Sequence, residues 1–267
     1  MTGQAGVLLV EADGPVRIVT LNRPDQLNAF SDELHVEFAR VWPELEDDPT
    51  ARAVVLTGAG RAFCAGGSTE EFELHQTDQQ ARRKVMRSAR RLVDEMLNVT
   101  LPVVAAVNGP AVGLGCTLAT LCDIVFMADR AFLADPHVSV ALVAGDGSAV
   151  TWPALTSLLK AKQYLLTGDR IPAQEAVAMG LANFVVPASE LMDAAVAFAH
   201  RIAAQPPQAV QDTKAVLNQH LRLSALATLG MGLAAETHSH DTVEYGDVVE
   251  RNREARTKAQ GKDAGAR

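Results

Sequence analysis

Two loops rich in small residues constrain the fold of this chain more than any other feature of its sequence. Residues 58–68 follow the apolar run 53–57, and residues 108–116 follow the apolar run 103–107. Each loop leads into a predicted helix, so strands and helices alternate, which indicates an α/β layered fold.

These loops fit one of two roles, and the sequence alone leaves both open. They are either plain turns after strands or a pair of backbone donors that together stabilise a developing oxyanion, because small residues admit a ligand and helix N-termini offer unpaired N–H groups. Neither loop is a phosphate-binding P-loop, because Lys followed by Ser or Thr is missing after the glycines.

The flanking segments continue the alternation and then become helical. Residues 7–11 and 16–21 are apolar, β-branched runs around a turn, which predicts an antiparallel hairpin. Ser31 is expected to cap a helix whose first turn is acidic. Further helices are predicted over residues 78–98, 148–158, 173–179, 189–204 and 207–220.

The composition is that of a globular protein with an acidic surface. Of the 267 residues, 48% are apolar, and the formal net charge is −8, which argues against nucleic acid or an anionic membrane as a partner. No secretory signal or membrane-spanning segment is expected. The three cysteines, Cys64, Cys116 and Cys122, lack the spacing of a metal site and indicate buried thiols. We therefore expect a cytoplasmic protein.

Five short motifs follow one another along the first half of the chain. They are residues 21–24 (LNRP), 63–67 (FCAGG), 106–109 (AVNG), 113–116 (GLGC) and 122–124 (CDI). Their order resembles that of the enoyl-CoA hydratase/isomerase (crotonase) superfamily over about residues 7–205.

The resemblance implies a spiral of strand–strand–helix turns over residues 1–205 and a helical oligomerisation region over residues 206–267. Members of this family assemble as homotrimers or as dimers of trimers, that is, hexamers. Apolar residues late in the chain, among them Leu217, Leu226 and Met231, need burial that a terminal helix cannot find alone.

The resemblance also implies an enzyme of fatty acid metabolism that binds acyl-CoA, with CoA as part of the substrate and no separate cofactor. Two backbone N–H groups, which belong here to Gly67 and Leu114, would form the oxyanion hole for the thioester oxygen. The residues expected along the CoA arm are Leu27, Ala29, Arg61, Ala65 and Ser68.

The departures from the family pattern concern the catalytic residues. Hydratases of the family carry two glutamates, and Thr117 and His137 stand at those positions. His137 followed by Asp146 resembles the His–Asp dyad with which β-diketone (oxo-camphor) hydrolases activate water. In this arrangement His137 is the base and Asp146 orients it. The alternative is that Asp146 caps a helix beginning near Ser148 and that His137 only packs beside it.

Three functions therefore stay open at the level of sequence. The first is an enoyl-CoA hydratase/isomerase-like enzyme that adds water to an acyl-CoA, either to hydrate it or to cleave a β-keto acyl group. The others are a CoA-independent retro-Claisen hydrolase of a β-diketone and a non-catalytic acyl-CoA-binding paralogue. No metal is expected, because His238 and His240 lie two residues apart on a predicted helix and point away from each other.

Overall fold

Parallel strands with two buried faces form the centre of the molecule. The computed structural model describes residues 6–68 and 72–264. β1 and β2 form the predicted antiparallel hairpin, and the remaining neighbours in the main sheet run parallel. In spatial order the strands are β1 (Leu8–Asp13), β2 (Val16–Leu21), β3 (Ala53–Gly58), β4 (Val103–Val107), β6 (Ile124–Ala128) and β9 (Phe184–Val186). Every residue of β3 and β4 is buried, as expected where helices cover both faces.

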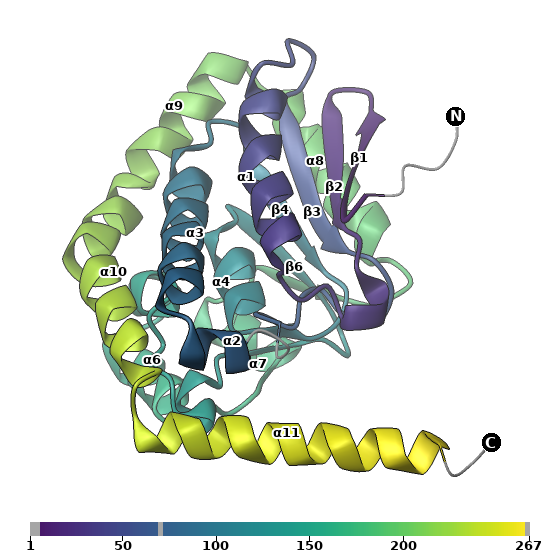
Figure 1. Cartoon of the computed structure of the whole chain (residues 1–267). Helices are drawn as coiled ribbons and strands as arrows, with labels where there is room; N and C mark the ends of the chain where they lie inside the picture. The colour runs from purple at the N-terminus through teal and green to yellow at the C-terminus, as the bar shows by residue number, and fades with distance from the viewer. Residues whose placement is uncertain (1–5, 69–71, 265–267) are drawn as a thin grey trace.

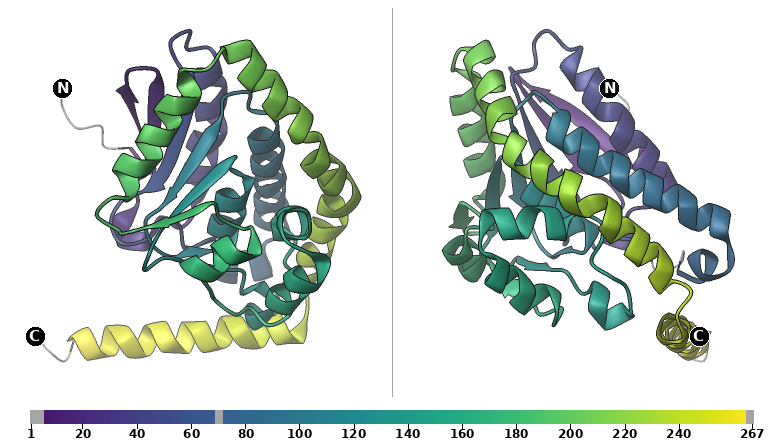
Figure 2. Two further views of the ribbon diagram at one scale, coloured as in Figure 1. Left: turned by 180° about the vertical axis from the view of Figure 1, so that it is seen from behind. Right: turned by 90° about the vertical axis from the view of Figure 1, so that its left-hand side faces the viewer.

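Helices cover this sheet on both faces, so the predicted α/β class is confirmed. α1 and α3 lie side by side on one face, and α8 crosses the other (Figures 1 and 2). The Ser31 Oγ accepts a hydrogen bond of 3.3 Å from the Leu34 N–H, as expected for a helix cap. The helices are α1 (Asp32–Glu46), α2 (Phe72–Thr77), α3 (Gln79–Asn98), α4 (Leu114–Leu121), α5 (Ser148–Leu155), α6 (Leu158–Leu165), α7 (Ala173–Met179), α8 (Leu191–Ala203), α9 (Pro207–Leu217), α10 (Gln219–Ser239) and α11 (Val243–Ala264).

A second, small sheet brings the two small-residue loops together. Its strands are β5 (Ala111–Val112), β7 (Phe132–Ala134) and β8 (Ile171–Pro172). Isolated bridges join Cys64 to Ala111 and Phe30 to Gly67. Gly115 makes this approach possible, because a Cβ there would lie 2.3 Å from the Cys64 carbonyl oxygen. The loops therefore meet at one end of the sheet.

The predicted helix over residues 148–158 ends early, and a separate helix begins at its predicted last residue. α5 ends at Leu155 and α6 begins at Leu158. Ser157 separates them, because its Oγ accepts a hydrogen bond of 3.2 Å from the Lys160 N–H and so caps a new helix.

The C-terminal helices combine a buried face with exposed apolar side chains. α10 packs against α5 and α3. The first part of α11 packs against α2 through the buried Tyr245, and its C-terminal part extends away from the rest of the protein (Figure 1). Leu229 is buried, whereas the exposed fractions of Leu217, Leu226 and Met231 are 61%, 83% and 75%. The predicted subunit interface in this region stays a prediction. Within residues 6–68 and 72–264, no helix has the length and apolar character needed to cross a membrane.

Candidate active site

The N–H groups of Gly67 and Leu114 are both available to a ligand. Leu114 is the first residue of α4, where an N–H has no acceptor inside the helix. Among the described residues, neither N–H donates a hydrogen bond to the backbone. Gly66 has a φ of +91° and turns its loop toward α4, so a Cβ on Gly66 would lie 3.7 Å from the Leu114 nitrogen.

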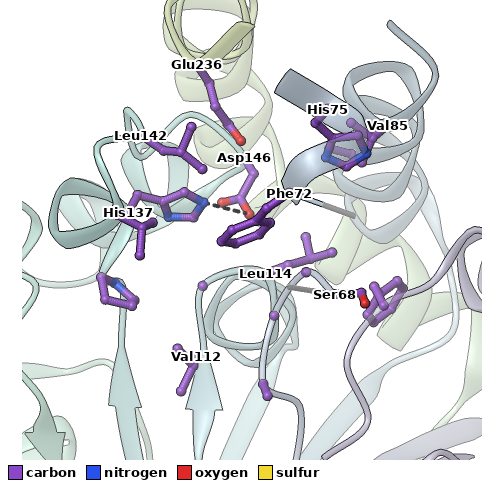
Figure 3. Close-up of a pocket in the computed structure, with 18 of the residues that line it drawn as sticks. Ser68, Phe72, His75, Val85, Val112, Leu114, His137, Leu142, Asp146 and Glu236 are labelled. Carbon is purple, nitrogen blue, oxygen red and sulfur yellow. Dashed lines mark ion pairs between the residues drawn. The ribbon is translucent and has the colours of Figure 1, made fainter. Parts of the chain in front are cut away.

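A cavity of about 330 Å³ lies beside these two amides. In the view of Figure 3, His137 and Leu142 lie on one side, His75 and Val85 lie on the other, and Phe72 lies between them. The cavity has the volume of a typical small-molecule site, and like such sites it combines apolar walls with a few polar groups. The apolar lining comes from Phe30, Phe72, Val85, Met86, Ala89, Val112, Leu114, Val140 and Leu142.

His137 lies between two carboxylates. Its Nδ1 forms a short hydrogen bond with the Asp135 Oδ1, and its Nε2 lies 3.6 Å from the Asp146 Oδ2 (Figure 3). The structure thus brings His137 and Asp146 close together. The carboxylate that forms a hydrogen bond with the imidazole, however, belongs to Asp135. Sequence reasoning missed Asp135 as a partner of His137, although it stands two positions earlier in the chain.

Asp146 faces the cavity and does not cap a helix. The N-cap of α5 is Gly147, without a side-chain cap. The Thr117 Oγ1, at the position where the family resemblance expects a glutamate, lies 3.2 Å from the Asp146 Oδ1 and donates a hydrogen bond to it. Thr117 therefore holds the carboxylate of Asp146 in place.

Glu236 is a third carboxylate at this end of the cavity, and sequence reasoning missed it. It lies on α10 and points toward Asp146 in Figure 3. Its exposed fraction is 6%, and its Oε2 has no hydrogen-bond partner among the described residues. No local pattern marks this residue, because it reaches the site only when α10 packs against the remainder of the fold.

These four groups influence one another's protonation. Burial lowers the pKa of His137, but the charges of Asp135 and Asp146 outweigh burial and raise that pKa well above its usual value. Burial raises the pKa of Asp146 and raises that of Glu236 to about 8. Burial also opposes ionisation of Asp135, but His137 and its hydrogen bonds lower the pKa of this carboxyl. The site therefore pairs the Asp135 carboxylate with a His137 imidazolium, and burial favours the protonated forms of Asp146 and Glu236.

The same cluster contains ligand types that metal ions use. One ligand atom each from Asp135, His137 and Asp146 can be chosen so that all lie within 4.8 Å of one another. The hydrogen bond between Asp135 and His137 already satisfies one nitrogen of the imidazole. The expectation that the protein uses no metal stays a prediction.

The residues expected along the CoA arm divide into two groups. Ala65 and Ser68 line the cavity, whereas Leu27, Ala29 and Arg61 do not. Leu27 lies next to the cavity wall, because its carbonyl accepts a hydrogen bond of 3.0 Å from the Ala65 N–H. The Arg61 side chain is exposed at the surface.

The sequence profile of the enoyl-CoA hydratase/isomerase family matches residues 11–254. The chain belongs to this family. A short-chain-enoyl-CoA hydratase from Clostridium acetobutylicum is 36% identical over 218 residues, which cover 80% of this chain and 82% of that protein. An (E)-benzylidenesuccinyl-CoA hydratase from Thauera aromatica is 34% identical over 217 residues, with coverages of 80% and 84%.

Solved structures of other enoyl-CoA hydratase/isomerase family members have the same fold. One from Mycobacterium paratuberculosis has a TM-score of 0.88 and 52% identity, and the match covers 92% of this chain and 98% of that chain. One from Xanthobacter autotrophicus Py2 has a TM-score of 0.87 and 28% identity, with coverages of 97% and 98%. The family and the fold predicted from the sequence motifs are therefore confirmed.

Proposed function

We propose that this member of the enoyl-CoA hydratase/isomerase family adds water to an acyl-CoA thioester. One observation carries the proposal: His137 lines the same cavity as the residues that bear the two unpaired amides, Gly67 and Leu114. A Cβ on Gly113 would lie 3.5 Å from the His137 ring, so the imidazole lies beside the N-terminus of α4.

The two amides would act on the thioester carbonyl. Both would donate to its oxygen and stabilise the negative charge that develops there as an enolate forms. Ala65 and Ser68 would lie beside the start of the CoA arm, and Leu27, Ala29 and Arg61 would line its path further from the reacting carbons.

His137 would transfer the protons. The Asp135 carboxylate would keep a proton on Nδ1, and Nε2 would act as the base in the neutral form of the imidazole. In that form Nε2 accepts a proton from water while the water oxygen bonds to the β-carbon. The resulting Nε2–H then donates its proton to the α-carbon of the enolate. One imidazole would thus do the work that two glutamates share in other hydratases.

A second candidate function is the hydrolytic cleavage of a β-diketone that carries no CoA. The observation that favours it is that both expected glutamates are replaced. His137 stands at one of these positions, and Thr117, whose hydroxyl donates a hydrogen bond to Asp146, stands at the other. Water activated by His137 would attack one carbonyl carbon, and the carbon–carbon bond beside it would break. The departing enolate would be held by the same two amides and then protonated by His137.

A substrate panel separates these functions. We would measure turnover of crotonyl-CoA and of a linear and a bicyclic β-diketone by wild-type protein, His137→Ala and a control, His200→Ala. His200 lies at the surface beside Asp13 and away from the cavity. The proposal expects crotonyl-CoA turnover that falls at least about a hundredfold in His137→Ala and is unchanged in the control.

The other outcomes of this panel are equally informative. Turnover of a β-diketone without turnover of crotonyl-CoA would favour the second candidate. Binding of CoA thioesters with no turnover of any substrate would contradict both and point to the non-catalytic paralogue.

A further inference from the structure

The cavity has a second polar side, away from His137, made of imidazoles. His35 comes from α1, His75 from α2, and His240 from the residue that follows α10. All three line the cavity, among the apolar side chains of Phe72, Val85 and Met86. We call His35, His75 and His240 the imidazole wall.

Aromatic neighbours hold the rings of this wall in place. The ring centroids of His75 and His240 are 6.0 Å apart, in an edge-on arrangement. The His240 ring lies 4.8 Å from that of Tyr245, and the His35 ring lies 4.9 Å from that of Phe30. Each imidazole of the wall therefore packs against at least one other ring.

The hydrogen bonding of His240 determines which of its nitrogens can serve a ligand. Its Nδ1 lies 2.8 Å from the Glu236 carbonyl oxygen. A carbonyl only accepts, so Nδ1 carries the hydrogen, and Nε2 of the neutral ring has a free lone pair. Among the described residues, none donates a hydrogen bond to this Nε2. A ligand group next to it must therefore be a donor.

The wall is neutral near pH 7. Burial lowers the pKa of His35 and of His75 to about 4, and it also lowers the pKa of His240. A neutral imidazole has one donor and one acceptor. A neutral ligand group that both donates and accepts therefore suits this wall better than a carboxylate, which only accepts.

We propose that the acyl group of the substrate carries a hydroxyl a few carbons beyond the thioester and that the imidazole wall, with His240 as acceptor, binds this hydroxyl. The inference rests on the proposed acyl-CoA function. His240, the residue that follows α10, lies one helical turn beyond Glu236, about 6 Å along the helix axis, so the reacting end of the cavity and the wall are separated by the length of a short acyl chain. A plain alkyl chain would leave the Nε2 of His240 without a donor, and sites built to bind a hydroxyl discriminate strongly against analogues that lack it.

Binding of three saturated CoA thioesters tests this proposal, because saturated acyl groups cannot be hydrated. Isothermal titration calorimetry would compare hexanoyl-CoA, ω-hydroxyhexanoyl-CoA and adipoyl-CoA, which ends in a carboxylate. We expect the hydroxyl compound to bind about tenfold more tightly than hexanoyl-CoA. His240→Leu should abolish this preference. His35→Phe, which keeps a ring at a buried position, should reduce the preference in a second, independent variant.

His220→Leu is the matched control, since His220 lies exposed on α10 and should leave the preference intact. Three outcomes would overturn this inference and leave the proposed acyl-CoA function standing. They are equal binding of hexanoyl-CoA and its hydroxyl derivative, tighter binding of adipoyl-CoA than of the hydroxyl derivative, and a preference that survives in both His240→Leu and His35→Phe. If none of the three thioesters binds, the proposed acyl-CoA function fails and this inference fails with it.

Discussion

Replacing Asp135 by Asn tests how His137 is activated. Asp135 is almost fully buried, and its Oδ1 accepts the short hydrogen bond from the His137 Nδ1. Asn has nearly the same shape but no charge, so the substitution removes the electrostatic part of this contact and leaves the packing in place. It also allows the amide NH₂ to face the ring and favour the wrong tautomer of the imidazole.

The size of the effect follows from this one contact. A hydrogen bond to a charged group contributes about 1.5–3 kcal/mol, and one pKa unit corresponds to about 1.4 kcal/mol, so losing the charge should lower the pKa of His137 by about 1–2 units. In the wild type that pKa lies well above 6.5. His137 accepts a proton only when Nε2 is unprotonated, so activity rises with pH through this pKa. Asp135→Asn should therefore shift the acid limb of the profile downward by about 1–2 pH units.

The assay is the pH dependence of kcat/KM on the best substrate for the wild type, Asp135→Asn and the control Asp129→Asn, which alters an exposed carboxylate. The maximal rate of Asp135→Asn should also fall, by about a hundredfold or more, because of the tautomer. An acid limb at the same pH in wild type and Asp135→Asn, or one displaced upward, would refute the reasoning. A melting temperature within a few degrees of wild type would show that the variant is folded.

Four further predictions follow from the same geometry. Gly67→Pro should abolish turnover in a steady-state assay because proline removes the N–H itself, whereas Leu114→Ala should change it little because only the backbone is used. His137→Ala should lower kcat at least about a hundredfold while the Kd of a CoA thioester changes far less. Burial raises the pKa of Glu236 from 4.5 to about 8, so the folded state keeps a proton that the unfolded state loses, and stability from this group falls as pH rises between these values. Glu236→Gln should therefore raise the melting temperature relative to wild type more at the alkaline end of this range than at the acidic end. Light scattering should find a trimer or hexamer, and Leu226→Lys, at a side chain 83% exposed in one subunit, should shift it toward monomer.

Local sequence signals were enough for the central elements. These signals depend on residues close together in the chain. They identified the hairpin of β1 and β2, the wholly buried strands β3 and β4, and the cap at Ser31. The two loops of small residues were also recognisable, because a glycine that lets two backbones approach cannot be replaced by a larger residue. The ordered motifs around them were enough to identify the family.

The candidate site was predictable only in part. His137 and Asp146 were found through the family resemblance, in which His137 stands at a glutamate position and is followed by Asp146, and the structure places them 3.6 Å apart. The hydrogen bond from His137 to Asp135 was missed, although the two residues stand only two positions apart, because closeness in sequence does not determine where the imidazole points. The break between α5 and α6 was missed because Ser157 reads equally well as a helix residue and as a cap.

By itself the sequence determined the family, the layered α/β class and the two amide-bearing loops, because these depend on local periodicity and on small residues in order. The tertiary structure decided which groups share the cavity. Glu236 on α10 and His240 just after it reach the cavity from a part of the chain distant from His137, because the apolar face of α10 packs against α3 and α5. The same packing removes water from the carboxyls and imidazoles, and burial sets their charge states in a way that no spacing of residues reveals.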